Sequence, residues 1–100
     1  MSEPIAVVVA RDLEDLVPTF MKNRGKEIEA LRAALAGADF EQMQQLGHRM
    51  KGVGNSYGFE KVSLLGRDIE DRARSGDRDG LAAAIAEYVD YLARVRVSYE

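Results

Sequence analysis

The apolar residues of this 100-residue chain recur at helical spacing along most of its length. Residues three, four and seven positions apart share one face of a helix, so a stripe of this kind marks the buried side. The stripes are Leu13, Val17, Phe20, Ile28, Leu31 and Leu35; then Met43, Leu46, Met50, Val53 and Tyr57; then Val62, Leu65, Ile69 and Ala73; and finally Leu81, Ile85, Tyr88, Leu92, Val95 and Tyr99. The pattern predicts amphipathic helices that pack around a shared core.

Capping and turn residues set the boundaries of the predicted helices. Pro18 disfavours helix at the residue before it, which separates a short leading helix from a longer one. Asp39, with Gln42 three residues on, is typical of a capping box that starts a helix. The stretch SGDRDG, residues 75–80, is typical of a turn. The predicted helices therefore span roughly residues 8–17, 18–36, 39–57, 60–75 and 78–98.

The short connections between these helices favour antiparallel neighbours. We therefore predict an all-α fold, an antiparallel up-down four-helix bundle with a short extra N-terminal helix. The whole chain, residues 1–100, is expected to form one domain. No segment longer than IAVVV, residues 5–9, has the composition of a strand.

Composition narrows the classes of function. The formal net charge is −3, so no basic field exists to attract nucleic acid or an anionic membrane surface. The chain has no cysteine, which excludes disulfides and thiolate metal sites. Its longest apolar run, IAVVVA, is far shorter than the roughly 20 residues that a membrane span needs. We expect a cytoplasmic, monomeric protein that binds neither nucleic acid nor membrane.

The only histidine, His48, is predicted to lie on the polar side of its helix, about half a turn from the centre of the apolar stripe. Lys51 and Gly52 follow one turn later on the same face. A glycine inside a helix costs about 0.5–1 kcal/mol relative to alanine, so Gly52 on an exposed face requires an explanation. Gly47 and Gly54 lie toward the packed side, where they predict a close helix approach.

Several interpretations of His48 compete. A structural histidine belongs on the apolar face, and an arbitrary surface histidine leaves the cost of Gly52 unexplained. A metal site needs several convergent donors, but the chain has no second histidine and no cysteine. Neutral imidazole, however, is a nucleophile that attacks phosphoryl groups. Lys51 can offset the phosphoryl charge, and Gly52 lets a partner's active site approach closely. These features predict a phosphoryl carrier that docks to a partner.

At these residues the sequence resembles the histidine-containing phosphotransfer (Hpt) domain of multistep phosphorelays. The family's signature is a histidine, any residue, an aliphatic residue, lysine and glycine, then a second glycine ten residues after the histidine and a leucine-like ladder that ends in glutamate. The matching residues are His48, Arg49, Met50, Lys51, Gly52, Gly58, Val62, Leu65, Ile69 and Glu70. The upstream stretch LVPTFMKNRGKEIEALRAALAGADFEQMQQLGHRMKG is similar to the family as well, so the resemblance covers nearly the whole chain.

The resemblance implies a carrier rather than an enzyme. Its phospho-acceptor, His48, is expected to exchange a phosphoryl group with an aspartate on the receiver domain of a response regulator or hybrid histidine kinase. The receiver is expected to supply Mg²⁺ and most of the catalytic machinery, so this chain needs no metal or cofactor of its own. Lys51 is expected near the phosphoryl group, and Gly52 is expected to clear space for docking.

Two further residues are assigned through the resemblance. Glu70 falls at a position suitable for orienting the imidazole, and Arg74, one turn further on, can add positive charge. The alternative is that Glu70 and Arg74 form an ordinary i,i+4 surface ion pair.

Two other functions compete with phosphoryl carriage. The phospho-acceptor of a histidine kinase is normally followed by an acidic residue and soon by a proline, but Arg49 follows His48 and no proline lies downstream. No GxxxxGK[ST] motif offers a site for ATP. The remaining alternative is a helical interaction module that binds a signalling partner without being phosphorylated.

Overall fold

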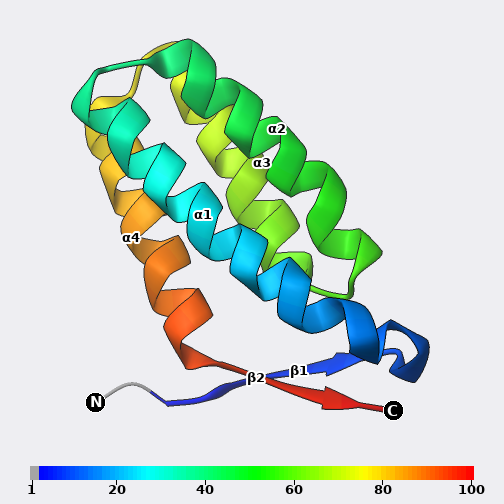
Figure 1. Ribbon diagram of the computed structural model, residues 1–100. Coiled ribbons are helices and arrows are strands. Elements are labelled where there is room, and N and C mark those ends of the chain that lie inside the picture. Colours follow the sequence, from blue (N-terminus) through cyan, green and yellow to red (C-terminus); the bar gives the residue numbers. More distant parts are fainter. Residues whose placement is uncertain (1–2) are drawn as a thin grey trace.

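The computed structural model describes residues 3–100 as four helices that run up and down beside one another, with two short strands across one end (Figure 1). In chain order the elements are β1 (Ile5–Val9), the 3₁₀ helix η1 (Arg11–Leu16), α1 (Val17–Ala36), α2 (Phe40–Ser56), α3 (Glu60–Ser75), α4 (Arg78–Arg94) and β2 (Val95–Tyr99). The four helices predicted from the apolar stripes are therefore confirmed. None of the helices within residues 3–100 combines the length and the apolar composition that a membrane span requires.

The ends of α2 are fixed by local hydrogen bonds. At its start, the Asp39 side chain accepts a hydrogen bond from the backbone N–H of Gln42 at 3.1 Å, as the capping pattern predicted. At its end, Gly58 adopts a φ of +85°, which glycine tolerates better than any other residue. This conformation lets the N–H of Phe59 donate to the carbonyl of Gly54 at 2.9 Å and closes the helix. The histidine-bearing helix is thus held at both ends.

The predicted N-terminal helix over 8–17 is wrong. Residues 8 and 9 belong to β1, and the following segment is the 3₁₀ helix η1 rather than an α-helix. The β-branched run in Ile5–Val9 favours an extended backbone. Pro18 stands in the first turn of α1, where its missing N–H costs nothing, so the α-helix begins beside the proline instead of before it.

The predicted end of the last helix at residue 98 is also wrong, because α4 stops at Arg94 and the chain continues as β2. Val95 and Tyr99 fit a helical stripe because they are four residues apart. They fit a strand face equally well, because four is also a multiple of two. Pairing with β1 decides between the two, in a parallel register that runs from Ile5 opposite Val95 to Val9 opposite Tyr99.

Helices α2 and α3 approach so closely that side chains are excluded at their contact. A Cβ added to Gly47 of α2 would lie 2.7 Å from the backbone oxygen of Gly66 on α3. A Cβ added to Gly54 would lie 2.6 Å from the backbone nitrogen of Ser63. Both distances are far below van der Waals contact, so only glycine fits. The close approach predicted for Gly47 and Gly54 is confirmed, and it sets the distance between the two helices that carry the candidate site.

Candidate functional site

His48 projects from the middle of α2 into solvent, and its side chain is 67% exposed. The buried residues of α2 include Met43, Leu46 and Met50, on the other side of the helix. The amphipathic pattern therefore placed the imidazole correctly. An exposed ring on a rigid helix is accessible to another protein without any rearrangement of the core.

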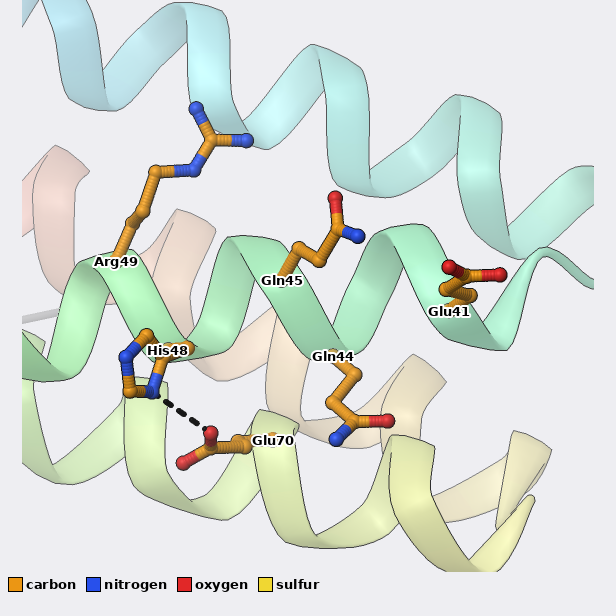
Figure 2. Close-up of a pocket in the computed structure, with 6 residues that line it drawn as sticks. All are labelled: Glu41, Gln44, Gln45, His48, Arg49 and Glu70. Atoms are coloured by element: carbon orange, nitrogen blue, oxygen red, sulfur yellow. Dashed lines mark hydrogen bonds and ion pairs between the residues drawn. The ribbon is translucent and has the colours of Figure 1, made fainter.

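Glu70 of α3 joins His48 and Lys51 of α2 through its two carboxylate oxygens. Oε2 lies 2.9 Å from His48 Nδ1, and Oε1 accepts a hydrogen bond from Lys51 Nζ at 2.7 Å. The Glu70 side chain is only 7% exposed, whereas its two partners reach the surface. Figure 2 shows His48 turned from α2 toward Glu70 on the neighbouring helix. A buried carboxylate thus anchors an exposed imidazole.

The ionisation of Glu70 determines the tautomer of the ring. The hydrogen bond from Lys51, with a further one from His48, holds the pKa of Glu70 below its ordinary value despite burial. An ionised carboxylate only accepts hydrogen bonds, so Nδ1 must carry the proton that is shared with Oε2. In a neutral ring the lone pair then lies on Nε2. The nucleophilic nitrogen is therefore the one that does not face Glu70.

The glycine contact between α2 and α3 brings Glu70 within reach of His48. A Cβ on Gly47 would lie 2.6 Å from the backbone nitrogen of Glu70. Any side chain at position 47 would push α3 away at the residue that holds the imidazole. Gly66 is the residue of α3 that faces Gly47 in this contact. The sequence does not predict its role, because that role depends on the helix that it faces.

Gly52 has the opposite surroundings. It is exposed, and a Cβ added there would have no neighbouring atom within 4 Å. Packing therefore does not require glycine at this position, although it lies one turn from His48 on the same helix. The open space agrees with the predicted polar face and leaves the helix cost of Gly52 unexplained by the fold.

Arg74 reaches the same carboxylate from α3. Its Nη2 lies 3.6 Å from Glu70 Oε2, and its Nη1 lies 3.4 Å from Asp71 Oδ1. The two contacts have the i,i+4 and i,i+3 spacing of helix ion pairs, and because the Arg74 side chain is 59% exposed, solvent screens both of them. A supporting role toward a phosphoryl group stays a prediction for Arg74.

Two hollows flank the His48–Glu70 pair. The larger, of about 780 Å³, lies toward the start of α2, and its lining residues are Glu41, Gln44, Gln45, His48, Arg49 and Glu70. The other, of about 460 Å³, is lined on the opposite side by Lys51, Asn55, Ser63, Leu64, Arg67, Glu70, Asp71 and Arg74. In Figure 2 the Arg49 side chain turns toward α1, away from Glu70.

Sequence reasoning missed Glu41, Gln44 and Gln45. They precede His48 by seven, four and three residues, so helical spacing alone could have placed them on its face.

Among the described residues, no group of three or more His, Cys, Asp or Glu side chains is arranged to hold a metal ion. What this site offers is an oriented nucleophilic nitrogen with a cation beside it.

The Glu70 contacts lead to a testable pH dependence. We expect Glu70→Gln to lower the free energy of unfolding by about 1–2 kcal/mol at neutral pH, through weakened bonds to His48 and Lys51. Because the folded pKa of Glu70 lies below its ordinary value, its contribution is complete above about pH 4.3 and is lost as pH falls through the folded pKa. Urea unfolding of both proteins across the acid range should show the difference shrinking. A difference that stays constant as pH falls would contradict this account of the carboxylate.

Comparison with known protein families assigns this chain to one of them. The family model described as "Hpt domain" matches residues 10–98, which is nearly the whole chain. Searches of curated proteins and of solved structures found no match.

Proposed function

The chain belongs to the Hpt domain family, and we propose that it accepts a phosphoryl group on His48 from a receiver-domain aspartate and passes it to another receiver domain. Proteins of this family carry phosphoryl groups on histidine in phosphorelays and interact with receiver domains. The observation that supports His48 as the carrier is its Nδ1 contact with the buried Glu70, at 2.9 Å, on an otherwise exposed ring. This contact leaves Nε2 as the free nucleophile.

The proposed step is a balanced phosphoryl transfer. The lone pair of His48 Nε2 attacks the phosphorus of the aspartyl phosphate, and the bond between phosphorus and the aspartate oxygen breaks. The receiver recovers a free carboxylate, and the ring becomes a phosphoimidazolium that keeps its proton on Nδ1. Glu70 Oε2 accepts that proton in a hydrogen bond and offsets the new positive charge on the ring. The reverse sequence passes the group to the next receiver.

Lys51 is proposed to stabilise the transferred group. Its Nζ donates a hydrogen bond to Glu70 Oε1 at 2.7 Å. Because the Lys51 side chain is 42% exposed, it can turn toward a phosphoryl oxygen near His48. Arg74 is a second cation at the edge of the same carboxylate. A divalent cation for the transfer is proposed to belong to the partner receiver domain, which also contributes most of the catalysis.

The experiment that tests this proposal is phosphoryl transfer from an isotopically labelled phospho-receiver to the full chain. We expect label on this chain that is acid-labile and base-stable, as a phosphoramidate is, and mass spectrometry should locate it on His48. A panel of receiver domains is needed because the natural partner is not specified by the site. Label on an aspartate of this chain would show that the acceptor is not His48. No label from any receiver would favour an interaction module that is never phosphorylated.

The open position at Gly52 is expected to separate stability from transfer. Gly52→Gln should raise the free energy of unfolding by about 0.5–1 kcal/mol, because it removes the glycine cost without any clash. The same side chain would stand beside the imidazole and obstruct a docking receiver, so transfer should slow. Thermal melts and transfer rates measure the two effects. Gly52→Ala is the matched control, because it gives the same stabilisation with a smaller obstruction. Transfer at the wild-type rate in Gly52→Gln would show that receivers do not approach over this face.

A further inference from the structure

A further hollow, of about 430 Å³, lies between α1 and α2, and Arg49 belongs both to it and to the hollow at His48. Figure 2 shows the Arg49 side chain turned toward α1. Helical spacing builds both walls, because each helix contributes residues three, four or seven positions apart. The residues that line this α1–α2 hollow are Asn23, Arg24, Lys26, Glu27 and Ala30 of α1 and Gln42, Leu46 and Arg49 of α2.

The lining of the α1–α2 hollow is positively charged. Its cations are Arg24, Lys26 and Arg49 and its one acid is Glu27, so three positive charges and one negative charge leave a formal net charge of +2. The chain as a whole carries −3, so the positive charge is a local feature. Lys26 and Arg49 are both exposed, and within residues 3–100 neither forms an ion pair.

Glu27 is a poor counter-ion for the exposed cations, because other groups already occupy its carboxylate. Oε1 accepts a hydrogen bond from the Tyr88 hydroxyl of α4 at 2.7 Å and lies 3.2 Å from Arg24 Nε. Burial raises the pKa of Glu27, although the Tyr88 hydrogen bond and the charges of Arg24 and Arg49 oppose the rise. Lys26 and Arg49 are therefore left without a direct partner.

Arg24 is the buried cation of the α1–α2 hollow. Its side chain is only 10% exposed, and its guanidinium lies over the Phe20 ring, 4.6 Å from the centroid. Within residues 3–100, neither Nε nor Nη1 of Arg24 makes a hydrogen bond. A buried charge with too few acceptors carries a desolvation cost. An acidic group that enters the hollow would offset this charge.

A protein that docks on His48 must cover Arg49 as well, because the two residues are consecutive. Specific protein interfaces bury roughly 800 Å² on each partner, far more than one side chain supplies. The part of the partner that lies over Arg49 meets the positive hollow. A free small anion is the weaker candidate, because Lys26 and Arg49 are exposed and solvent screens their attraction for an isolated ion.

We propose that the α1–α2 hollow binds a carboxylate side chain of the receiver domain that docks on His48, a contact that rests on the proposed function. Arg49 and Lys26 can donate hydrogen bonds to the carboxylate, and the guanidinium of Arg49 can do so through two parallel bonds. The buried charge of Arg24 adds to the attraction. The contact selects receivers that have an acidic side chain at the matching position, and it acts on docking rather than on the transfer step.

The test measures how fast the full chain is labelled at increasing concentrations of a phospho-receiver that labels the wild-type chain. Arg49→Gln and Lys26→Gln should each raise the half-saturating receiver concentration by about three- to tenfold and change the maximal rate by less than about twofold. Arg32→Gln is the matched control, because it removes an exposed positive charge from α1 outside this hollow, and it should change neither value. Arg49→Lys keeps the charge and should recover most of the affinity.

A second set of variants identifies the carboxylate. Surface Asp and Glu residues of the same receiver are changed one at a time to Asn or Gln and tested against the wild-type and Arg49→Gln chains. One of these changes should weaken docking to the wild-type chain by about the same factor as Arg49→Gln, with no further loss when the two are combined. Losses that multiply for every receiver acid would overturn the proposal, because no carboxylate would then depend on Arg49.

The outcomes separate this contact from phosphoryl carriage itself. No label on the wild-type chain from any receiver would overturn the proposed function and this contact together. Labelled His48 with equal half-saturating concentrations for wild type, Arg49→Gln and Lys26→Gln would overturn the contact alone. So would inorganic phosphate that saturates the Lys26 and Arg49 signals in an NMR titration at millimolar concentration without weakening receiver docking, because the hollow would then hold a free anion.

Discussion

Replacing His48 with glutamine is expected to abolish phosphoryl labelling of this chain while leaving the fold intact. The imidazole is 67% exposed, so its removal creates no cavity. A glutamine amide is not a nucleophile at neutral pH, but its N–H can still donate to Glu70 Oε2. The loss of stability should therefore stay near or below about 1 kcal/mol, a decrease in Tm of about 4–8 °C at most for a domain of this size.

The measurement pairs a thermal melt with transfer from a labelled phospho-receiver. Lys51→Gln is the matched control, because it changes the other partner of Glu70 and leaves the acceptor nitrogen in place. That variant should still become labelled, at a lower rate. Undiminished labelling of His48→Gln would show that the acceptor lies elsewhere and would remove the proposed function.

The exposed face of α2 could be predicted from the sequence because the apolar stripe is regular. Met43 and Met50 lie seven residues apart and are both fully buried, which leaves His48 on the outer side. The open surroundings of Gly52 follow from the same helical periodicity, since Gly52 is four residues from His48 and lies on the same face. The face on which a residue lies is determined by the periodicity of its own helix, so the positions of His48 and Gly52 could be predicted without knowledge of the neighbouring helices.

The features that depend on two elements at once were harder to predict. Val95 and Tyr99 satisfy both helical and strand periods, so only the presence of β1 decides that the last residues are extended. The sequence motif marked Glu70, but its bond to Lys51 depends on the distance between α2 and α3. That distance depends on Gly66, which has no unusual neighbours in the sequence and becomes significant only where it faces Gly47.

The contact between Gly47 and Gly66 leads to a second prediction, of a large loss in both stability and phosphoryl transfer. Gly47→Ala is expected to lower the free energy of unfolding by about 1–3 kcal/mol, although alanine is the better helix former. The added Cβ would lie 2.6 Å from the backbone nitrogen of Glu70 and 2.7 Å from the oxygen of Gly66, and neither backbone atom can move without shifting α3. The shift should lengthen the hydrogen bond between Glu70 and His48 and slow phosphoryl transfer by about tenfold or more.

Gly52→Ala is the matched control for this prediction, because it makes the same substitution on the same helix where no atom lies within 4 Å. It should raise stability by about 0.5–1 kcal/mol, so the two variants are expected to move in opposite directions. Urea unfolding measures the stabilities, and the NMR signals of the His48 ring nitrogens report whether Nδ1 still carries the proton shared with Glu70. A Gly47→Ala protein as stable as Gly52→Ala would show that α3 moves aside freely. If the Nδ1 proton and the transfer rate were then also unchanged, the close contact of α2 and α3 would not be what orients the imidazole.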